Sequence, residues 1–127
     1  MHSETESALV DRLSRYESLV EVGIGRRHGV AAGLAARGRR IVATDVHHRD
    51  VPDGVAFVRD DVTAADPTIY RGAEAVYALN CPPELQSPLV SVAASVGADC
   101  LFTTLGTDPA VVEASPETLP GATLFAV

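Results

Sequence analysis

The chain has 127 residues, enough for one compact domain, which we expect to span residues 1–127. Hydrophobic residues make up 46% of it and aromatic residues 5%, so the core must be built mainly from Ala, Val and Leu, as in buried parallel strands and their covering helices. The formal net charge of −7, with ten arginines and no lysine, argues against general electrostatic attachment to nucleic acid.

The number of cysteines and the hydropathy pattern indicate which cellular compartment the protein occupies. Cys81 and Cys100 are too few for a disulfide framework and lack the paired spacing of a zinc site, so we expect reduced thiols and no bound metal. The N-terminal residues lack the pattern of a secretory signal, and no apolar run approaches the ~20 residues needed to span a bilayer. We expect a cytoplasmic protein without membrane association, and the acidic, lysine-free composition predicts a salt-loving archaeal source.

Predicted helices and strands alternate along the chain. Capping-box spacing and helical periodicity predict an opening helix, and small apolar segments closed by glycine predict later ones. The predicted helices are 3–16, 28–37, 66–72 and 87–96, with one more helical turn at Asp108-Pro109. The predicted strands are 19–22, 40–44, 55–58, 75–79, 100–104 and 122–127.

This alternation predicts an α/β fold. We expect a Rossmann-like three-layer αβα sandwich with a mostly parallel sheet of five to six strands in the order 3-2-1-4-5. Such sheets bind ligands outside the carboxyl ends of their strands, so the functional residues should follow strands one to four.

The first strand runs into a glycine loop, Glu21-Val22-Gly23-Ile24-Gly25. Glycine lets the backbone turn tightly and approach a ligand where any Cβ would clash. The segment resembles the first motif of class I S-adenosylmethionine-dependent methyltransferases, and this resemblance implies an S-adenosylmethionine site that includes Glu21, Gly23 and Gly25. The alternative is a tight strand-to-helix turn that binds no ligand.

Acidic residues follow the second and third predicted strands. Asp45 lies twenty positions after Gly25, at the strand end where such folds place an acid to accept the ribose hydroxyls. Asp61 follows the third strand, where the methyltransferase resemblance implies an acid near the adenine amino group. The alternative for both is a solvated turn residue, because acids are common in turns.

The fourth strand is followed by Asn80-Cys81-Pro82-Pro83-Glu84, which is similar to the Asn-Pro-Pro-aromatic motif of methyltransferases that act on amino groups. Cys81 is inserted, and Glu84 stands where the aromatic residue would be, so the catalytic role of that motif does not carry over. Asn80 remains a candidate for ligand contact, and no residue is assigned as a catalytic base. Otherwise the two prolines only stiffen the loop and begin the next helix.

A dinucleotide is the main competing ligand. His28 occupies the place of the third glycine in Gly-x-Gly-x-x-Gly, and Glu21 would repel a pyrophosphate but attract the cationic end of S-adenosylmethionine. Arg26 and Arg27, at the start of a helix, would instead favour a phosphate. A non-catalytic nucleotide- or NAD(P)-binding sensing or interaction module therefore stays open as the second hypothesis.

The segments VEVGIG, ATDV and PPEL, with the short length, resemble the archaeal uncharacterised protein family 0146, small Rossmann-like proteins related in fold to methyltransferases. A complete methyltransferase follows its fifth strand with a helix and an antiparallel strand pair, whereas only 23 residues follow Thr104 here, with one predicted strand. We therefore expect a truncated methyltransferase-like fold that binds the cofactor. Whether it is an enzyme with an acceptor of its own stays open, and a homo-oligomer or a partner protein could complete the site.

Overall fold

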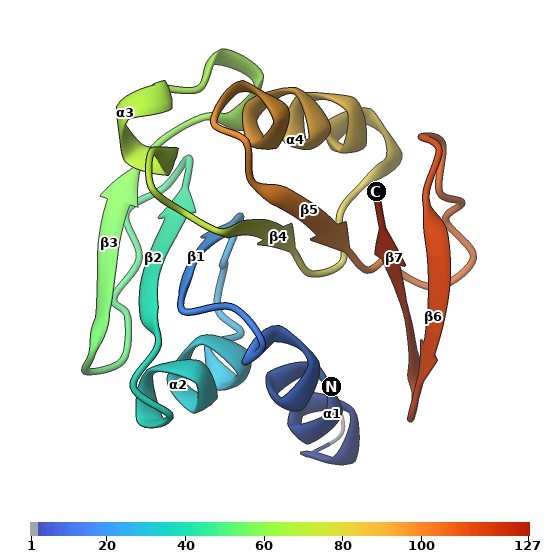
Figure 1. The fold of residues 1–127 in the computed structure, drawn as a ribbon, viewed down its shortest axis with the longest axis horizontal. Helices are drawn as coiled ribbons and strands as arrows, with labels where there is room; N and C mark the ends of the chain where they lie inside the picture. The colour runs from blue at the N-terminus through green and yellow to red at the C-terminus, as the bar shows by residue number, and fades with distance from the viewer. Residues whose placement is uncertain (1–2) are drawn as a thin grey trace.

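The computed structural model describes residues 3–127 and builds them around one seven-stranded sheet (Figure 1). The first five strands pair in parallel, whereas β7 is antiparallel to both β5 and β6. Their spatial order, β3-β2-β1-β4-β5-β7-β6, contains the predicted order 3-2-1-4-5, and the α/β class is confirmed. In chain order, β1 to β7 span Ser18–Val22, Arg40–Asp45, Val55–Arg59, Ala75–Ala78, Asp99–Phe102, Ser115–Leu119 and Ala122–Ala126.

Helices cover both faces of this sheet and give the predicted three layers. Helices α1 (Ser3–Leu13) and α2 (Gly29–Ala36) lie on one face, and α3 (Pro67–Tyr70) and α4 (Pro83–Ser95) lie on the other (Figure 1). A 3-10 turn, η1 (Val62–Ala64), packs against α4. Within residues 3–127, no helix is both long and apolar enough to cross a membrane.

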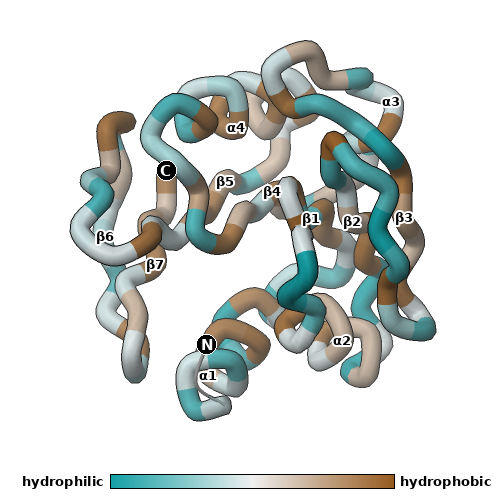
Figure 2. The backbone as a smooth tube through the Cα atoms, turned by 180° about the vertical axis from the view of Figure 1, so that it is seen from behind, coloured by the Kyte–Doolittle hydropathy of each residue, from teal (hydrophilic) through white to brown (hydrophobic). Residues whose placement is uncertain are grey.

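The alternation of side chains along the strands divides the apolar residues between two cores. On β1, Leu19 belongs to the core under α1 and α2, while Val20 belongs to the core under α3 and α4. Strand β4 is buried at all its residues, as expected for a central parallel strand. Figure 2 shows hydrophobic stretches along the central strands and a long hydrophilic stretch beside β3. Both cores combine aliphatic side chains with buried aromatic ones, such as Tyr77 on one face and Phe102 on the other.

The C-terminal region differs from the sequence-based prediction. Strand β6 pairs with β7 in an antiparallel hairpin, so the sheet has seven strands rather than the five or six expected. The sequence of β6 is polar. Most of this strand is exposed because it forms the edge of the sheet, where a proline such as Pro116 is tolerated. Sequence reasoning assigns one strand to the residues after Thr104, whereas the structure has an antiparallel pair there. What is shortened is the connection between β5 and β6, which is a loop, 103–114, without the predicted helical turn at Asp108-Pro109.

Helix α4 begins at Pro83 rather than at Ser87. Pro82 and Pro83 fit the first positions of a helix, whose backbone donors have no partner within the helix. The earlier start places the buried Gln86 inside α4, where its side-chain amide donates to the carbonyl of Pro109 at 2.9 Å and accepts from the amide of Val111 at 2.7 Å. These two bonds hold the loop 103–114 against α4.

Candidate functional site

The glycine loop between β1 and α2 turns with two residues in the left-handed backbone region. Gly23 and Gly25 have φ angles of 69° and 57°, which only glycine adopts without strain. The amides of Gly23 and Ile24 both donate to the carbonyl of Thr44, at 2.9 and 3.1 Å, and the Ile24 side chain is buried in the core under α2. The loop is therefore held both by backbone hydrogen bonds and by the burial of the Ile24 side chain.

Asp45 ties this loop to the end of β2. Its carboxylate accepts from the amide of Gly25 at 2.9 Å and from the amide of His47 at 3.0 Å, and Arg49 Nε lies 3.5 Å away. Burial would by itself raise the pKa of Asp45, but these two amides and the Arg49 charge hold it below its ordinary value. Two carboxylate oxygens can accept about four hydrogen bonds, so Asp45 keeps capacity for a ligand hydroxyl.

Glu21 lies beneath the loop, on the α1 and α2 side of the sheet. Its carboxyl is 2% exposed and accepts a hydrogen bond of 2.6 Å from the hydroxyl of Tyr77, its neighbour in register on β4. Burial raises the pKa of Glu21 to about 8, and the bond from Tyr77 opposes this only in part. At neutral pH the group is therefore chiefly the neutral acid, and a bound cation would lower the pKa and favour the carboxylate.

Two cavities open at the carboxyl ends of β1 and β4. The first has a volume of about 240 Å³ and is lined by Glu21 and by the glycine loop, including the residues that follow it as far as Arg27. We call it the polar chamber. The second, of about 260 Å³, is lined mainly by aliphatic side chains such as Val62 and Leu89, and we call it the apolar chamber. Both include Gly23 and Asn80 in their linings, so the two chambers adjoin.

Asn80 lines both chambers, and its backbone adopts an unusual conformation. Its φ of 53° lies in the left-handed region, which asparagine tolerates better than most residues. The backbone amide of Asn80 donates to Thr103 Oγ1 at 2.8 Å, and the backbone amide of Cys81 donates to the Thr103 carbonyl at 2.7 Å. Cys81 is buried rather than exposed in the loop, and burial raises the pKa of its thiol to about 11.

Asp61 lines neither of the two chambers. It is exposed and caps η1, accepting from the amide of Thr63 at 2.9 Å and from the Thr63 hydroxyl at 2.6 Å. These bonds hold the pKa of Asp61 below its ordinary value. The next residue, Val62, is the one whose side chain lines the apolar chamber.

Of the residues named from the sequence, Glu21, Gly23, Gly25 and Asn80 line the polar chamber, whereas Asp45 lines neither chamber and joins this group through its bond to Gly25. Sequence reasoning missed Tyr77 on β4, which holds Glu21, and Thr103 just after β5, which holds Asn80. The predicted strand ends would place Ala78 beside Glu21, whereas the observed register, with β4 ending at Ala78, places Tyr77 there. Among residues 3–127, no group of three or more His, Cys, Asp and Glu side chains could hold a metal ion.

Solved structures with the same fold include methyltransferases. An RNA methyltransferase from Salinibacter ruber, in complex with S-adenosyl-L-homocysteine, has a TM-score of 0.71 at 16% identity, covering 99% of this chain and 90% of that one. Magnesium protoporphyrin IX methyltransferase from Synechocystis PCC 6803, with bound S-adenosylmethionine, has a TM-score of 0.67 at 13% identity, covering 96% and 76%. The chain therefore has a methyltransferase-like fold; at these identities the likeness concerns the fold alone.

Closer relatives are found by sequence. The model of a family described as "Uncharacterised protein family (UPF0146)" matches residues 5–123. The UPF0146 protein of the archaeon Halobacterium salinarum is 52% identical over 114 residues, which cover 89% of this chain and 88% of that protein. The chain belongs to the uncharacterised protein family UPF0146.

Proposed function

We propose that this protein binds S-adenosylmethionine in the two adjoining chambers and is a methyltransferase-like protein. The observation that carries the proposal is the convergence of Glu21, the glycine loop and Asn80 on two cavities that share Gly23 and Asn80 at the carboxyl ends of β1 and β4. The solved structures of the same fold described above, which hold S-adenosylmethionine or S-adenosyl-L-homocysteine, support it.

The residues present fit the parts of this ligand. The apolar chamber offers aliphatic contacts to a flat adenine ring, and Asp45 keeps acceptor capacity for ribose hydroxyls. In the polar chamber Glu21 offers a buried carboxyl to a cationic ammonium group. When bound, S-adenosylmethionine would supply a methyl group for direct displacement by a nucleophile, and the protein's contribution would be to position the two reactants. Asp61 stays a prediction as the contact to adenine.

Calorimetry and thermal shift in molar potassium chloride test the proposal. S-Adenosylmethionine and S-adenosylhomocysteine should both bind and raise the melting temperature, because binding to the folded state alone stabilises it. 5′-Methylthioadenosine, which lacks the amino-acid end, should bind more weakly. Glu21→Gln should reduce this difference while leaving the affinity for 5′-methylthioadenosine unchanged. Absence of heat and of stabilisation with both S-adenosyl ligands would show the proposal to be wrong.

A second candidate, a nucleotide-sensing module, is favoured by Arg26 and Arg27. Both are exposed in the wall of the polar chamber just before α2, and neither belongs to the ion pairs found among residues 3–127. Under this candidate, NAD(P) or an adenine nucleotide raises the melting temperature, and Arg26→Ala weakens the effect. A melting temperature unmoved by a nucleotide panel would eliminate it.

The other sequence-based expectations remain proposals beside this one. We propose a cytoplasmic, salt-adapted protein that forms a single domain over residues 1–127. Cys81 and Cys100 are both buried thiols outside any disulfide, which agrees with a reducing compartment. The archaeal relatives agree with the predicted source.

A further inference from the structure

A larger cavity, of about 750 Å³, lies between α1, the loop 103–114 and the β6–β7 hairpin, and we call it the hairpin cavity. It shares Arg27 and Asn80 with the polar chamber, so the two cavities adjoin at the carboxyl end of β4. Its volume falls within the range of roughly 300–1,000 Å³ that is typical of small-molecule sites. A second reactant therefore has room beside the proposed cofactor site.

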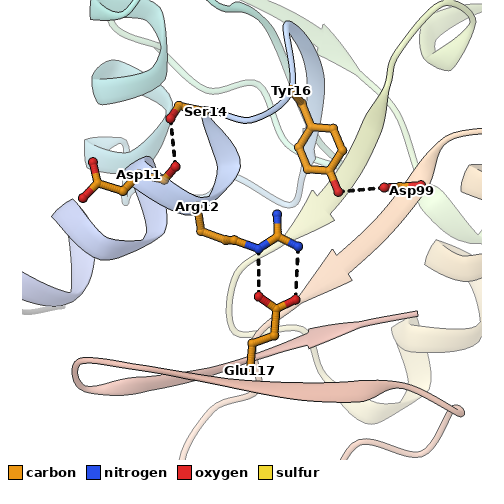
Figure 3. Close-up of polar contacts among 6 residues, drawn as sticks. All are labelled: Asp11, Arg12, Ser14, Tyr16, Asp99 and Glu117. Carbon is orange, nitrogen blue, oxygen red and sulfur yellow. Dashed lines mark hydrogen bonds and ion pairs between the residues drawn. The ribbon is translucent and has the colours of Figure 1, made fainter.

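The walls of the hairpin cavity are held in place by contacts within this chain. The guanidinium of Arg12 donates to both carboxylate oxygens of Glu117, at 2.8 and 3.1 Å, and so joins α1 to β6 (Figure 3). At the hairpin turn, Thr5 from α1 packs so closely on Gly121 that a Cβ there would collide with its hydroxyl. On the third side of the cavity, the two hydrogen bonds of the Gln86 side chain hold the loop 103–114 in place. The cavity is therefore preformed.

The lining of this cavity is polar and holds a single group that could remove a proton, the carboxylate of Asp108. Six of its fifteen lining residues are threonines, and its only titratable side chains are Arg27 and Asp108. The guanidinium is always protonated and so cannot act as a base, and the lining contains no His, Lys, Cys or Tyr. An acceptor that is already ionised therefore suits this lining, because it needs no base.

We propose that the hairpin cavity binds a small carboxylic acid and that the carboxylate of this acid is the methyl acceptor. A carboxylate is already ionised at neutral pH, Arg27 provides a cation to bind it, and Asp108 disfavours a second negative charge. The threonine hydroxyls suit further hydroxyl or carbonyl groups on the same molecule. This inference rests on the proposed binding of S-adenosylmethionine.

The transfer that this pairing allows needs no proton movement. A lone pair of the carboxylate oxygen forms the new bond to the methyl carbon, while the bond from that carbon to sulfur breaks and leaves its electron pair on sulfur. The products are a neutral methyl ester and S-adenosylhomocysteine. The negative charge of the acid and the positive charge of the sulfonium cancel, so the step is balanced without a base.

A nucleic-acid substrate fits these observations poorly. The chain has a net charge of −7 and no lysine, and the hairpin cavity holds one arginine beside one aspartate. Binding of a nucleic-acid backbone draws its affinity from several cationic contacts to successive phosphates. A small molecule with a single negative charge needs only one cationic contact.

The test begins with the affinity of the intact protein for S-adenosylhomocysteine. With that ligand saturating, a panel of small hydroxy- and oxo-carboxylic acids is titrated against the matching primary amides, and methyl esters formed from S-adenosylmethionine are measured by mass spectrometry. At least one acid should bind more tightly than its amide and yield an ester. Arg27→Gln should weaken acid binding by about tenfold or more and abolish the preference over the amide.

Matched variants separate the two sites. Arg71→Gln, which changes an exposed arginine that lines none of the three cavities, should leave acid binding unchanged. Thr118→Val with Thr123→Val should weaken acid binding without changing the affinity for S-adenosylhomocysteine. If S-adenosylhomocysteine binds but amides bind as well as acids, or RNA oligonucleotides are methylated instead, the inference is overturned and the cofactor proposal stands. If S-adenosylhomocysteine does not bind, both fall.

Discussion

At the scale of single residues, Glu21 places an ionisable group in surroundings that are almost closed to solvent. The side chain is 2% exposed, its hydrogen-bond partner is the hydroxyl of Tyr77, and burial raises its pKa to about 8 from an ordinary 4.5. In the unfolded chain the same group ionises near its ordinary pKa. The folded state therefore binds a proton that the unfolded state releases over the interval between these two values.

The first prediction concerns the pH dependence of stability. The favourable contribution of protonated Glu21 is complete below about pH 4.5 and is lost as the pH rises through about 8, so the free energy of unfolding should fall across this window. Glu21→Gln keeps the size of the side chain and cannot ionise. Relative to this variant, the wild type should lose on the order of 4 kcal/mol between pH 5 and 9 in urea denaturation followed by circular dichroism. Parallel pH profiles for the two proteins would contradict the assignment.

A second prediction concerns Asp45 as an anchor of the glycine loop. Asp45→Ala leaves the amides of Gly25 and His47 without their acceptor, so the free energy of unfolding should fall by about 1–3 kcal/mol. Asp53→Ala, in an exposed turn, is the matched control and should change it by less than about 0.5 kcal/mol. Equal losses in urea denaturation would mean that the carboxylate of Asp45 does not hold the loop.

Most candidate site residues could be found from the sequence because their positions follow from local rules. A strand that runs into closely spaced glycines, and an acid at the end of the next strand, are defined by spacing alone, and Gly25 and Asp45 are joined in the structure. The burial of Glu21 could not be predicted in this way, since it depends on Tyr77 from a strand far along the chain. The capping of η1 by Asp61 is local, but the same residue type serves ligand contact and capping equally well.

At the scale of elements, the β6–β7 hairpin was the part that the sequence pattern did not reveal. An edge strand needs neither alternation of apolar residues nor a full set of backbone donors, so β6 carries no strong strand signal. What fixes it in place is tertiary contact, including the ion pair from Glu117 on β6 to Arg12 on α1.

The third prediction tests that contact with a double-mutant cycle of Arg12→Gln and Glu117→Gln. The pair is bidentate, with side chains 12% and 34% exposed, so the coupling should be about 1 kcal/mol in the free energy of unfolding. The ion pair holds the pKa of Glu117 below its ordinary 4.5, and the coupling should therefore be present above that pH and vanish as the pH falls through the lowered value.

The control is a second pair on the same helix. Arg37 and Asp11 join α1 to the end of α2, but their side chains are 45% and 67% exposed. Solvent screening should leave their coupling below about 0.5 kcal/mol. A cycle in which the exposed pair matches or exceeds Arg12 and Glu117 would show that the hairpin is not held by this contact.

At the scale of the whole molecule, the net charge of −7 creates repulsion that salt reduces. The fourth prediction is that the melting temperature, followed by circular dichroism because the chain has no tryptophan, rises as potassium chloride increases from about 0.1 M to about 1 M. Over this range the screening length falls from about 10 Å to about 3 Å. Asp50→Asn with Asp53→Asn removes two exposed negative charges and should flatten the rise. An unchanged or falling melting temperature would contradict the proposed salt adaptation.

The sequence by itself determined the α/β class, the parallel order of the first five strands and the position of the glycine loop. These follow from short-range patterns, since alternating apolar segments and glycine spacing act within a few residues. Only the tertiary structure decided that the loop after β5 is followed by a hairpin, and that this hairpin closes against α1 to form a cavity beside Asn80. Edge strands, buried hydrogen-bond partners and cavities arise where segments distant in sequence meet, and no local pattern encodes such a meeting.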